Sequence, residues 1–237
     1  VPSGASYPLS IRDTYRKIYP SFFEKLKIKP IKEYPSMLRE SMDYVNCGGI
    51  NVVLTPGRFN SAYYEHAYLA KKIGAQLVRN NELIVQNKVL FFKNYDGRLV
   101  RVGAVYRRLD DEFLDPKFFN EESLIGVPGI MEAYLAGNVA IMNAPGNGVA
   151  DDKGIYYFVP KMIKYYLGEE PILDNAPTYL PYFEEDKKYI FDNIEKLVIK
   201  DVAEAGGYGV MFGHAMTKIQ LSDLKTIIEA NPRRFIA

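Results

Sequence analysis

The hydrophobic residues in the first 50 positions have the spacing of amphipathic helices. Between residues 11 and 26, apolar and aromatic side chains recur at mixed three- and four-residue intervals, with an interruption near Pro20. A second helix is expected to start at residue 35 or 36 and to extend through Met42, before a pair of glycines. Residues 1–50 are therefore predicted to form a mainly helical segment.

From residue 51 the pattern changes to short buried strands that alternate with helices. Residues 51–54 are largely apolar and end before Pro56 and Gly57. A helix capped by Asn60 or Ser61 is predicted to extend to residue 73, and residues 75–78 form the next strand. This strand–helix–strand order is typical of a parallel crossover unit.

Residues 82–107 alternate in the manner of β-strands. Two apolar runs, 89–92 and 99–102, flank an Asp96-Gly97 pair, which favours a hairpin turn. Residues 104–106 are predicted to form another buried strand. The same criteria predict a helix at 130–136, a strand at 139–142 and a long helix from about 152 to 168.

The section from residue 172 has a different order of elements. The sequence predicts a helix at 187–197, a strand at 198–200, a glycine-rich loop at 204–209, a strand at 210–212 and a last helix at 222–229. The fold class is therefore predicted to be α/β, with an α+β C-terminal lobe. The expected divisions are 1–50, 51–171 and 172–237.

Composition narrows the functional classes. Hydrophobic residues make up 48% of the chain and charged residues 25%, and the formal net charge is +1, so nothing in the bulk charge favours nucleic acid or a membrane surface. No apolar run is long enough for a transmembrane helix. One cysteine and two histidines make a zinc site improbable, and a single cysteine fits a reducing, cytoplasmic compartment.

The glycine-rich loop is the strongest candidate for chemistry. Phosphates need backbone N–H groups at close range, and glycines remove the side chains that would obstruct that approach. Lys200 ends the preceding strand, and Gly206, Gly207 and Gly209 follow within nine residues. The loop joins two strands, which argues against a Walker loop or a dinucleotide fingerprint. By itself, this pattern equally fits an ordinary glycine hairpin with a surface lysine.

Two other strand ends carry charged residues. Lys153 follows a polar loop at a helix start, where free N–H groups favour anions, although a solvated lysine beside a capped helix is the simpler reading. Arg107 and Arg108 follow a buried strand and could grip a carboxylate or phosphate, or could pair with the acids that follow them. His66 is the one side chain at the 60–66 junction that titrates near neutrality, and a structural role is the commoner one.

Five segments together resemble the circularly permuted ATP-grasp family of type 2, the group similar to glutathionylspermidine synthase. Their order and spacing match nearly the whole chain. In sequence order they are VPSGASY at 1–7, LTPG with NSAYYEH at 54–57 and 60–66, YRRLDDEFLDP at 106–116, NAPG with ADDK at 143–146 and 150–153, and VIK with GGYG at 198–200 and 206–209.

The resemblance implies roles for particular residues. It implies contacts to the phosphates of ATP for Lys153, Lys200, Gly206, Gly207, Tyr208 and Gly209. It implies acceptor-side or structural roles for Ser3, Gly4, Ser6, Tyr7, Arg107, Arg108 and Asp110. We assign Arg107, Arg108 and Asp110 as candidate catalytic residues, and Ser3, Gly4, Ser6, Tyr7, Asn60, Ser61 and Glu65 as candidate substrate-binding residues. Asp201 stands where many relatives have proline, and we expect an acid beside Lys200 to weaken phosphate binding.

The resemblance also implies that the chain is the central part of such a fold. The acidic magnesium motif is expected upstream of Val1 and the adenine-side hinge beyond Ala237, so no metal ligand is assigned within the chain. The implied cofactors are ATP and Mg²⁺. We expect a fragment with half a site at each end, inactive by itself.

The implied reaction is the ligation of a carboxylate to an amine through an acylphosphate. The substrates are small-molecule or peptide carboxylates and amines that the sequence does not identify, and the oligomeric state is equally open. An alternative is a catalytically inactive nucleotide-binding scaffold or regulatory module. A dinucleotide-binding domain over residues 51–78 is disfavoured, because Thr55-Pro56-Gly57-Arg58 lacks the required glycine spacing.

Overall fold

The computed structural model describes residues 4–204 and 207–237, which fall into two compact units. The first unit extends to Gly146 and the second begins at Asn147. This division differs from the expected boundary at residue 171, because the helix at Lys153–Leu167 belongs to the second unit. Among the described residues, no helix combines the length and apolar character needed to cross a membrane.

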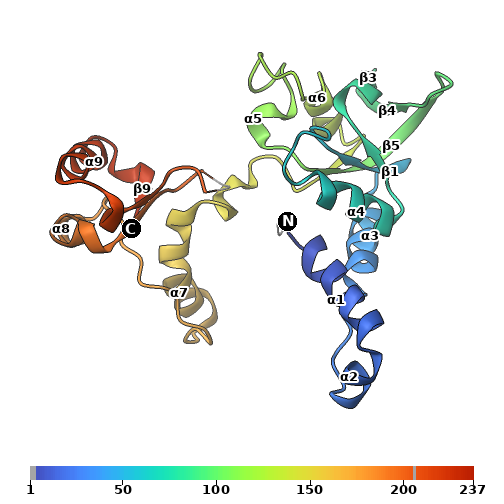
Figure 1. Ribbon diagram of the computed structural model, residues 1–237. Helices are drawn as coiled ribbons and strands as arrows, with labels where there is room; N and C mark the ends of the chain where they lie inside the picture. The colour runs from blue at the N-terminus through green and yellow to red at the C-terminus, as the bar shows by residue number, and fades with distance from the viewer. Residues whose placement is uncertain (1–3, 205–206) are drawn as a thin grey trace. The chain divides into compact units, whose positions relative to one another are not determined.

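The first unit is built on a six-stranded mixed sheet (Figure 1). The strand order is β2-β1-β5-β4-β3, and β6 also pairs with β5. Strands β1, β2, β5 and β6 run parallel, whereas β3 and β4 form the antiparallel part. The bounds are Ile50–Leu54 for β1, Gln76–Val78 for β2, Leu83–Gln86 for β3, Val89–Lys93 for β4, Leu99–Arg107 for β5 and Ala140–Met142 for β6.

Strand β5 is continuous, so the prediction of two separate strands at 99–102 and 104–106 was wrong. Gly103 interrupts the apolar pattern but not the strand. Its hydrogen side chain leaves room for Asn46, because a Cβ at this position would lie 2.0 Å from Asn46 Oδ1. The glycine is therefore explained by a close neighbour and not by a turn.

Helices pack on both faces of this sheet. Helices α3 (Tyr34–Val45) and α4 (Tyr63–Ile73) contribute to one core, which is centred on Met42, Val53, Leu69 and Tyr106. On the other face, α6 (Ile130–Leu135) packs against the second core. The expected break at Pro20 is confirmed, since α1 (Ser6–Ile18) ends before α2 (Pro20–Lys25). Short helices lie at Asn80–Glu82 (η1) and Asp111–Leu114 (α5).

The α4 start differs from the expectation. Neither Asn60 nor Ser61 caps the helix, whose N-cap position is occupied by Ala62 without a side-chain bond. Asn60 Oδ1 instead accepts a hydrogen bond from Ala62 N across 2.9 Å and so closes a local turn before the helix. The other end is as expected, because Gly74 has the left-handed conformation of a helix stop.

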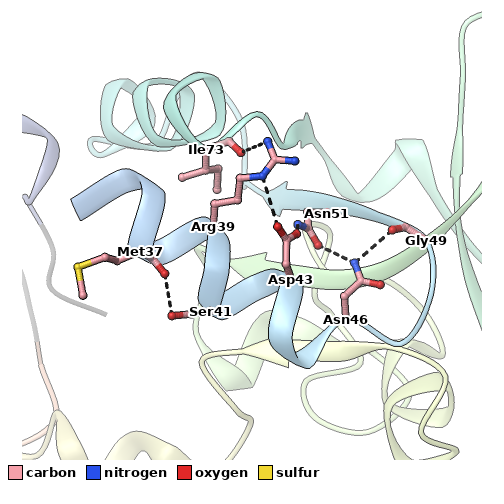
Figure 2. Close-up of polar contacts among 8 residues, drawn as sticks. All are labelled: Met37, Arg39, Ser41, Asp43, Asn46, Gly49, Asn51 and Ile73. Carbon is pink, nitrogen blue, oxygen red and sulfur yellow. Dashed lines mark hydrogen bonds and ion pairs between the residues drawn. The ribbon is translucent and has the colours of Figure 1, made fainter. Parts of the chain in front are cut away.

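A chain of polar contacts fixes α3 to the start of β1 (Figure 2). Arg39 Nη1 donates to the carbonyl of Ile73 at 3.2 Å, and Arg39 Nε pairs with Asp43. The other oxygen of Asp43 accepts from Asn51 Nδ2 at 2.6 Å, and Asn51 Oδ1 accepts from Asn46 Nδ2 at 2.7 Å. The helical segment before residue 50 is thus tied to the sheet.

The second unit contains a three-stranded antiparallel sheet of order β8-β7-β9. Its strands are β7 (Val198–Asp201), β8 (Val210–Phe212) and β9 (Phe235–Ile236). The helices are α7 (Lys153–Leu167), α8 (Glu184–Asn193) and α9 (Lys218–Ala230). Short 3₁₀ turns lie at Asn147–Ala150 (η2), Ile194–Lys196 (η3), Gly213–Ala215 (η4) and Pro232–Arg234 (η5).

Two helix boundaries in this unit were predicted wrongly. Helix α8 begins at Glu184, three positions before the expected start. Helix α9 begins at Lys218 and not at Ser222, because Thr217 and Gln220 form a capping box: Gln220 N donates to Thr217 Oγ1, and Thr217 N donates to Gln220 Oε1. The edge strand β9 was not foreseen, since two apolar residues carry too little pattern.

Candidate functional site

In the first unit, a buried ion pair joins residues that lie far apart in the sequence. Arg108 Nη2 donates to Glu65 Oε1 across 2.6 Å, and Glu65 is fully buried. The second oxygen, Glu65 Oε2, accepts from Ser6 N at 3.2 Å and from Ser6 Oγ at 3.1 Å. Ser6, Glu65 and Arg108, all predicted site residues, are therefore brought together.

Three elements deliver these side chains to one place. Arg108 follows β5, and its N–H donates to the carbonyl of Leu54 at the end of the neighbouring strand β1. Glu65 lies in the first turn of α4, and Ser6 is the first residue of α1. The cluster thus lies at the carboxyl edge of the parallel strands, where ligands bind in open α/β sheets.

The environment keeps Glu65 ionised. Burial by itself would raise the pKa of Glu65, but hydrogen bonds from the backbone N–H groups of Gly4 and Ser6 and the charge of Arg108 lower this pKa below its ordinary value. A buried pair of this kind contributes little net stability, whereas removal of one partner leaves an unpaired buried charge. Glu65 and Arg108 therefore depend on each other.

His66 adjoins this cluster and is neutral. Burial and the charge of Arg108 lower the pKa of His66 to about 4, against the opposing effect of Glu65. His66 Nδ1 and Thr55 Oγ1 share a hydrogen bond of 2.8 Å, and Gly57 N donates to the same hydroxyl oxygen at 3.1 Å. The contacts that involve His66 tie helix α4 to the loop after β1.

Arg107 makes a different set of contacts from its neighbour. Its guanidinium donates to the carbonyls of Asn143 at 2.7 Å, Leu109 at 2.8 Å and Ala144 at 3.3 Å. It also pairs with Asp111 at 2.6 Å. Arg107 therefore holds the loop after β6 against the end of β5. Its catalytic role remains a hypothesis, and these contacts make a positioning role the simpler one.

Asp110, Asn60, Ser61 and Tyr7, which are also predicted site residues of this unit, lie at the surface. Asp110 is exposed and precedes the short helix α5. Asn60 and Ser61 are exposed in the loop before α4. The ring of Tyr7 lies 5.4 Å from the ring of Tyr64, which anchors the start of α1 to α4. Ser3 lies outside the described residues, so its predicted role is not addressed by the structure.

In the second unit, Lys200 occupies the central strand of the small sheet. It pairs in register with Val210 of β8 and Ile236 of β9. Among the described residues, no hydrogen bond or ion pair engages its ammonium group. A cation that is fixed at its backbone and uncommitted at its tip is suited to an anionic ligand.

The structure shows contacts of Asp201 that the sequence did not indicate. Asp201 is buried, pairs with Arg234 Nε, and accepts from Ala203 N at 2.9 Å. Successive strand residues point to opposite faces, so Asp201 is turned away from Lys200. Burial opposes ionisation of Asp201, yet hydrogen bonds from Arg234 and Ala203 lower its pKa. Asp201 thus organises the loop, and its carboxylate pairs with Arg234 and not with Lys200.

Lys153 lies against the same loop. It is the first residue of α7, and its backbone N–H donates to the carbonyl of Val202 at 3.0 Å. Its ammonium group donates to the carbonyls of Val202, at 3.4 Å, and of Glu204. The structure therefore brings Lys153 to the loop that follows Lys200, a proximity that the sequence alone did not establish.

The glycines of this loop have the backbone geometry that only glycine adopts easily. Gly207 has a φ of +87° and Gly209 a φ of +67°. A Cβ on Gly209 would also lie 2.9 Å from the Cβ of Asp201. Tyr208 between them is 77% exposed and so projects from the loop. Gly206 lies outside the described residues.

Arg234 and Thr55 were missed by the sequence reasoning. Arg234 is the last residue of the Pro-containing turn η5, and only the pairing of β9 with β7 brings it to Asp201. Thr55 directly follows a strand, a position that could have been considered. Within 4–204 and 207–237, no three His, Cys, Asp or Glu side chains gather closely enough to hold a metal ion.

Comparison with known proteins identifies the family. All of residues 1–237 match the sequence profile of a family described as a circularly permuted ATPgrasp. The chain belongs to this family. The mixed α/β structure is consistent with part of a circularly permuted ATP-grasp fold.

Several bacterial proteins are similar to this ATP-grasp chain over its full length. An uncharacterized protein of Synechocystis sp. is 47% identical, and one of Mycobacterium tuberculosis is 38% identical; the chain covers 50% and 43% of their lengths. A protein of Frankia alni, named as a candidate glutamate–cysteine ligase, is 36% identical, and the chain covers 28% of it. The chain thus spans half or less of each of these relatives.

Proposed function

We propose that this chain is part of an ATP-dependent carboxylate–amine ligase. Membership of the ATP-grasp family supports the use of ATP, and two Frankia relatives at 36% and 35% identity support a ligase-like activity. Because the chain spans 28% of those proteins, the acid and amine substrates of the whole protein remain part of the proposal. The proposed setting is the cytoplasm, which the single cysteine favours.

The arrangement around Lys200 carries the proposal. Lys200 and Lys153 belong to one unit, and Lys153 contacts the loop that directly follows the Lys200 strand. Gly207, where an added Cβ would meet nothing within 4 Å, leaves the end of that loop open to a close backbone approach. The ammonium group of Lys200 and the backbone N–H groups of a glycine-rich loop suit the negative charge of a triphosphate. In this proposal, Lys200 and the loop N–H groups contact the phosphates, and Lys153 holds the loop.

The chemistry proceeds in two steps. A carboxylate oxygen attacks the γ-phosphorus of ATP, the bond to the β-phosphate oxygen breaks, and ADP leaves. The amine then attacks the acyl carbon, inorganic phosphate leaves, and the amine loses one proton. Negative charge gathers on phosphoryl oxygens in both steps, so lysines held in place stabilise both transition states. Mg²⁺, which the family generally uses, would neutralise phosphate charge.

The cluster in the first unit has a supporting role in this proposal. The bond from Arg108 to Glu65 fixes the end of β5 relative to the starts of α4 and α1. This edge of the sheet is then preorganised, and it is bordered by the loop at 60–61 and by the N-terminal residues Gly4, Ser6 and Tyr7. Substrate positioning of this kind requires rigid supports.

Calorimetry with Mg-ATP tests the phosphate contacts in the intact protein. One charge-assisted contact contributes roughly 1.5–3 kcal/mol, so Lys200→Ala should weaken ATP binding by about 10- to 100-fold. Lys196→Ala is the matched control, because Lys196 is exposed on the preceding turn. Equal affinity of Lys200→Ala and the parent protein would contradict the assignment.

A trapping experiment separates a ligase from an inactive scaffold. Hydroxylamine converts an acylphosphate into a stable hydroxamate, so incubation with ATP, a panel of carboxylic acids and hydroxylamine should yield a hydroxamate together with ADP. If ATP binds but no acid gives ADP or hydroxamate, the scaffold alternative is the correct one.

A further inference from the structure

A cavity opens in the first unit beside the strands that carry the buried cluster. Its volume is about 620 Å³, within the range of small-molecule sites. The lining comes from the loop after β1, from the residues that follow β2, and from the hairpin turn that contains Tyr95. It therefore lies at the carboxyl ends of two parallel strands, the usual position for a ligand in such a sheet.

Two arginines supply the charge of this cavity. Arg58 is exposed and lies over the ring of Phe59, with its Cζ 5.1 Å from the ring centroid. Among the described residues, no carboxylate pairs with Arg58. Arg79 pairs with Glu82, whose Oε2 lies 3.5 Å from Arg79 Nε and accepts from Arg79 N at 2.8 Å.

The charges in the lining do not cancel. Arg58, Arg79 and Glu82 are its charged residues, which leaves one net positive charge. Glu82 is already occupied by the backbone and side chain of Arg79. The uncommitted donors are therefore those of Arg58 and the terminal nitrogens of Arg79. A guanidinium group matches the two oxygens of a carboxylate.

The rest of the lining is suited to a short carbon skeleton. Tyr63 and Leu77, both partly exposed, contribute ring and aliphatic surface. Thr55 does not compete for the ligand, because its hydroxyl oxygen is engaged by Gly57 N at 3.1 Å and by His66 at 2.8 Å. The polar recognition in this cavity is thus concentrated in the arginines.

We propose that this cavity binds a free carboxylate of one of the ligase substrates, with Arg58 and Arg79 as the recognition residues. The inference rests on the proposed function. A carboxylate that accepts hydrogen bonds from two guanidinium groups has its lone pairs engaged, and it is therefore a poor nucleophile towards phosphorus. The carboxylate bound by the arginines thus serves for recognition and does not react. The substrate therefore carries a second, reacting group, either another carboxylate or an amine.

Calorimetry on the intact protein tests the site with simple probes. Succinate represents a dicarboxylate, glycine an amine with a carboxylate handle, and succinamide a neutral analogue of succinate. At least one of the first two should bind, and succinamide should not. Arg58→Ala and Arg79→Ala should each weaken that binding by about 10- to 100-fold. Both side chains are largely exposed, so neither change should unfold the protein.

Arg98→Ala is the matched control, because Arg98 is exposed on the neighbouring hairpin but does not line the cavity. Loss of binding in Arg98→Ala, equal binding of succinamide, or equal binding of inorganic phosphate would overturn the proposal. So would the absence of any binding by succinate and glycine. Mg-ATP binding, measured on the same samples, keeps the two hypotheses apart: a failure of the carboxylate probes alone leaves the Lys200 assignment intact, and a failure of ATP alone leaves the cavity assignment intact.

Discussion

Arg108 reaches Glu65 across 2.6 Å although the two residues are separated by 43 positions in the chain. The side chain of Arg108 is 10% exposed and that of Glu65 is fully buried, so each charge relies on the other for its solvation. This pair joins the end of β5 to the start of α4, and Ser6 extends it to α1.

Substitution of one partner should destabilise the protein strongly. Arg108→Met leaves the carboxylate of Glu65 buried with its ion-pair partner removed, and the expected loss is about 3–5 kcal/mol in the free energy of unfolding. Urea denaturation measures it. Arg98→Ala removes the exposed pair with Asp96 and should cost less than about 1 kcal/mol. A loss of similar size in both variants would contradict the account of the buried pair.

The pH dependence of stability should report on His66. The pKa of this histidine is lowered to about 4 in the folded protein by burial and by Arg108, from an ordinary value of 6.5. The unfolded chain therefore binds more protons between these values, and stability falls as the pH is lowered from 6.5 through 4. The expected contribution is about 3 kcal/mol.

His66→Gln should flatten this part of the profile. Glu65 adds a loss in the same direction at lower pH, because its folded-state pKa is depressed and its stabilising contribution disappears as pH falls through that pKa. Denaturation midpoints at several pH values between 7 and 4 measure the difference between parent and variant. An unchanged slope in His66→Gln would show that His66 is not buried in its neutral form.

Asp201→Asn should weaken the protein and its nucleotide site, although the sequence suggested the opposite. The change removes the charge that pairs with Arg234 and that accepts from Ala203 N. A hydrogen bond to a charged group contributes about 1.5–3 kcal/mol, and the exposure of Arg234 places the expected loss at the low end. Thermal unfolding and Mg-ATP calorimetry measure both effects. Tighter ATP binding by Asp201→Asn would instead support the expectation from the sequence that an acid beside Lys200 weakens phosphate binding.

The loop glycines should differ in their sensitivity to alanine. Gly209→Ala combines a positive φ with a Cβ contact of 2.9 Å to Asp201, whereas Gly207→Ala meets open space and carries only the backbone strain of about 1–2 kcal/mol. Gly209→Ala should therefore reduce stability and ATP affinity more. Gly168→Ala imposes similar backbone strain at the end of α7 with no neighbour within 4 Å, so it should lower stability without changing ATP affinity. Equal ATP affinities in all three variants would contradict the hypothesis that this loop contacts the nucleotide.

Local pattern was sufficient for most of the elements. The apolar run of β1, the Asp-Gly turn between β4 and β5 and the glycine stop of α4 are each encoded within a few residues, because backbone sterics and hydrophobic spacing act over one or two turns. The pattern failed where the signal was two residues long, as in β9, and where Gly103 had a distant cause in Asn46. The start of α9 was missed because the capping box of Thr217 was overlooked.

The sequence by itself determined the α/β class, the candidate lysine and glycine positions, and a family resemblance that the comparison with known proteins confirmed. Only the tertiary structure decided which charges meet. Asp201 stands next to Lys200 in the sequence but pairs with Arg234, because strand neighbours face opposite sides and β9 returns beside β7. Contacts between charged side chains depend on distances in space. Those distances are set when the fold brings together residues that lie tens of positions apart, and local periodicity in the sequence does not encode this.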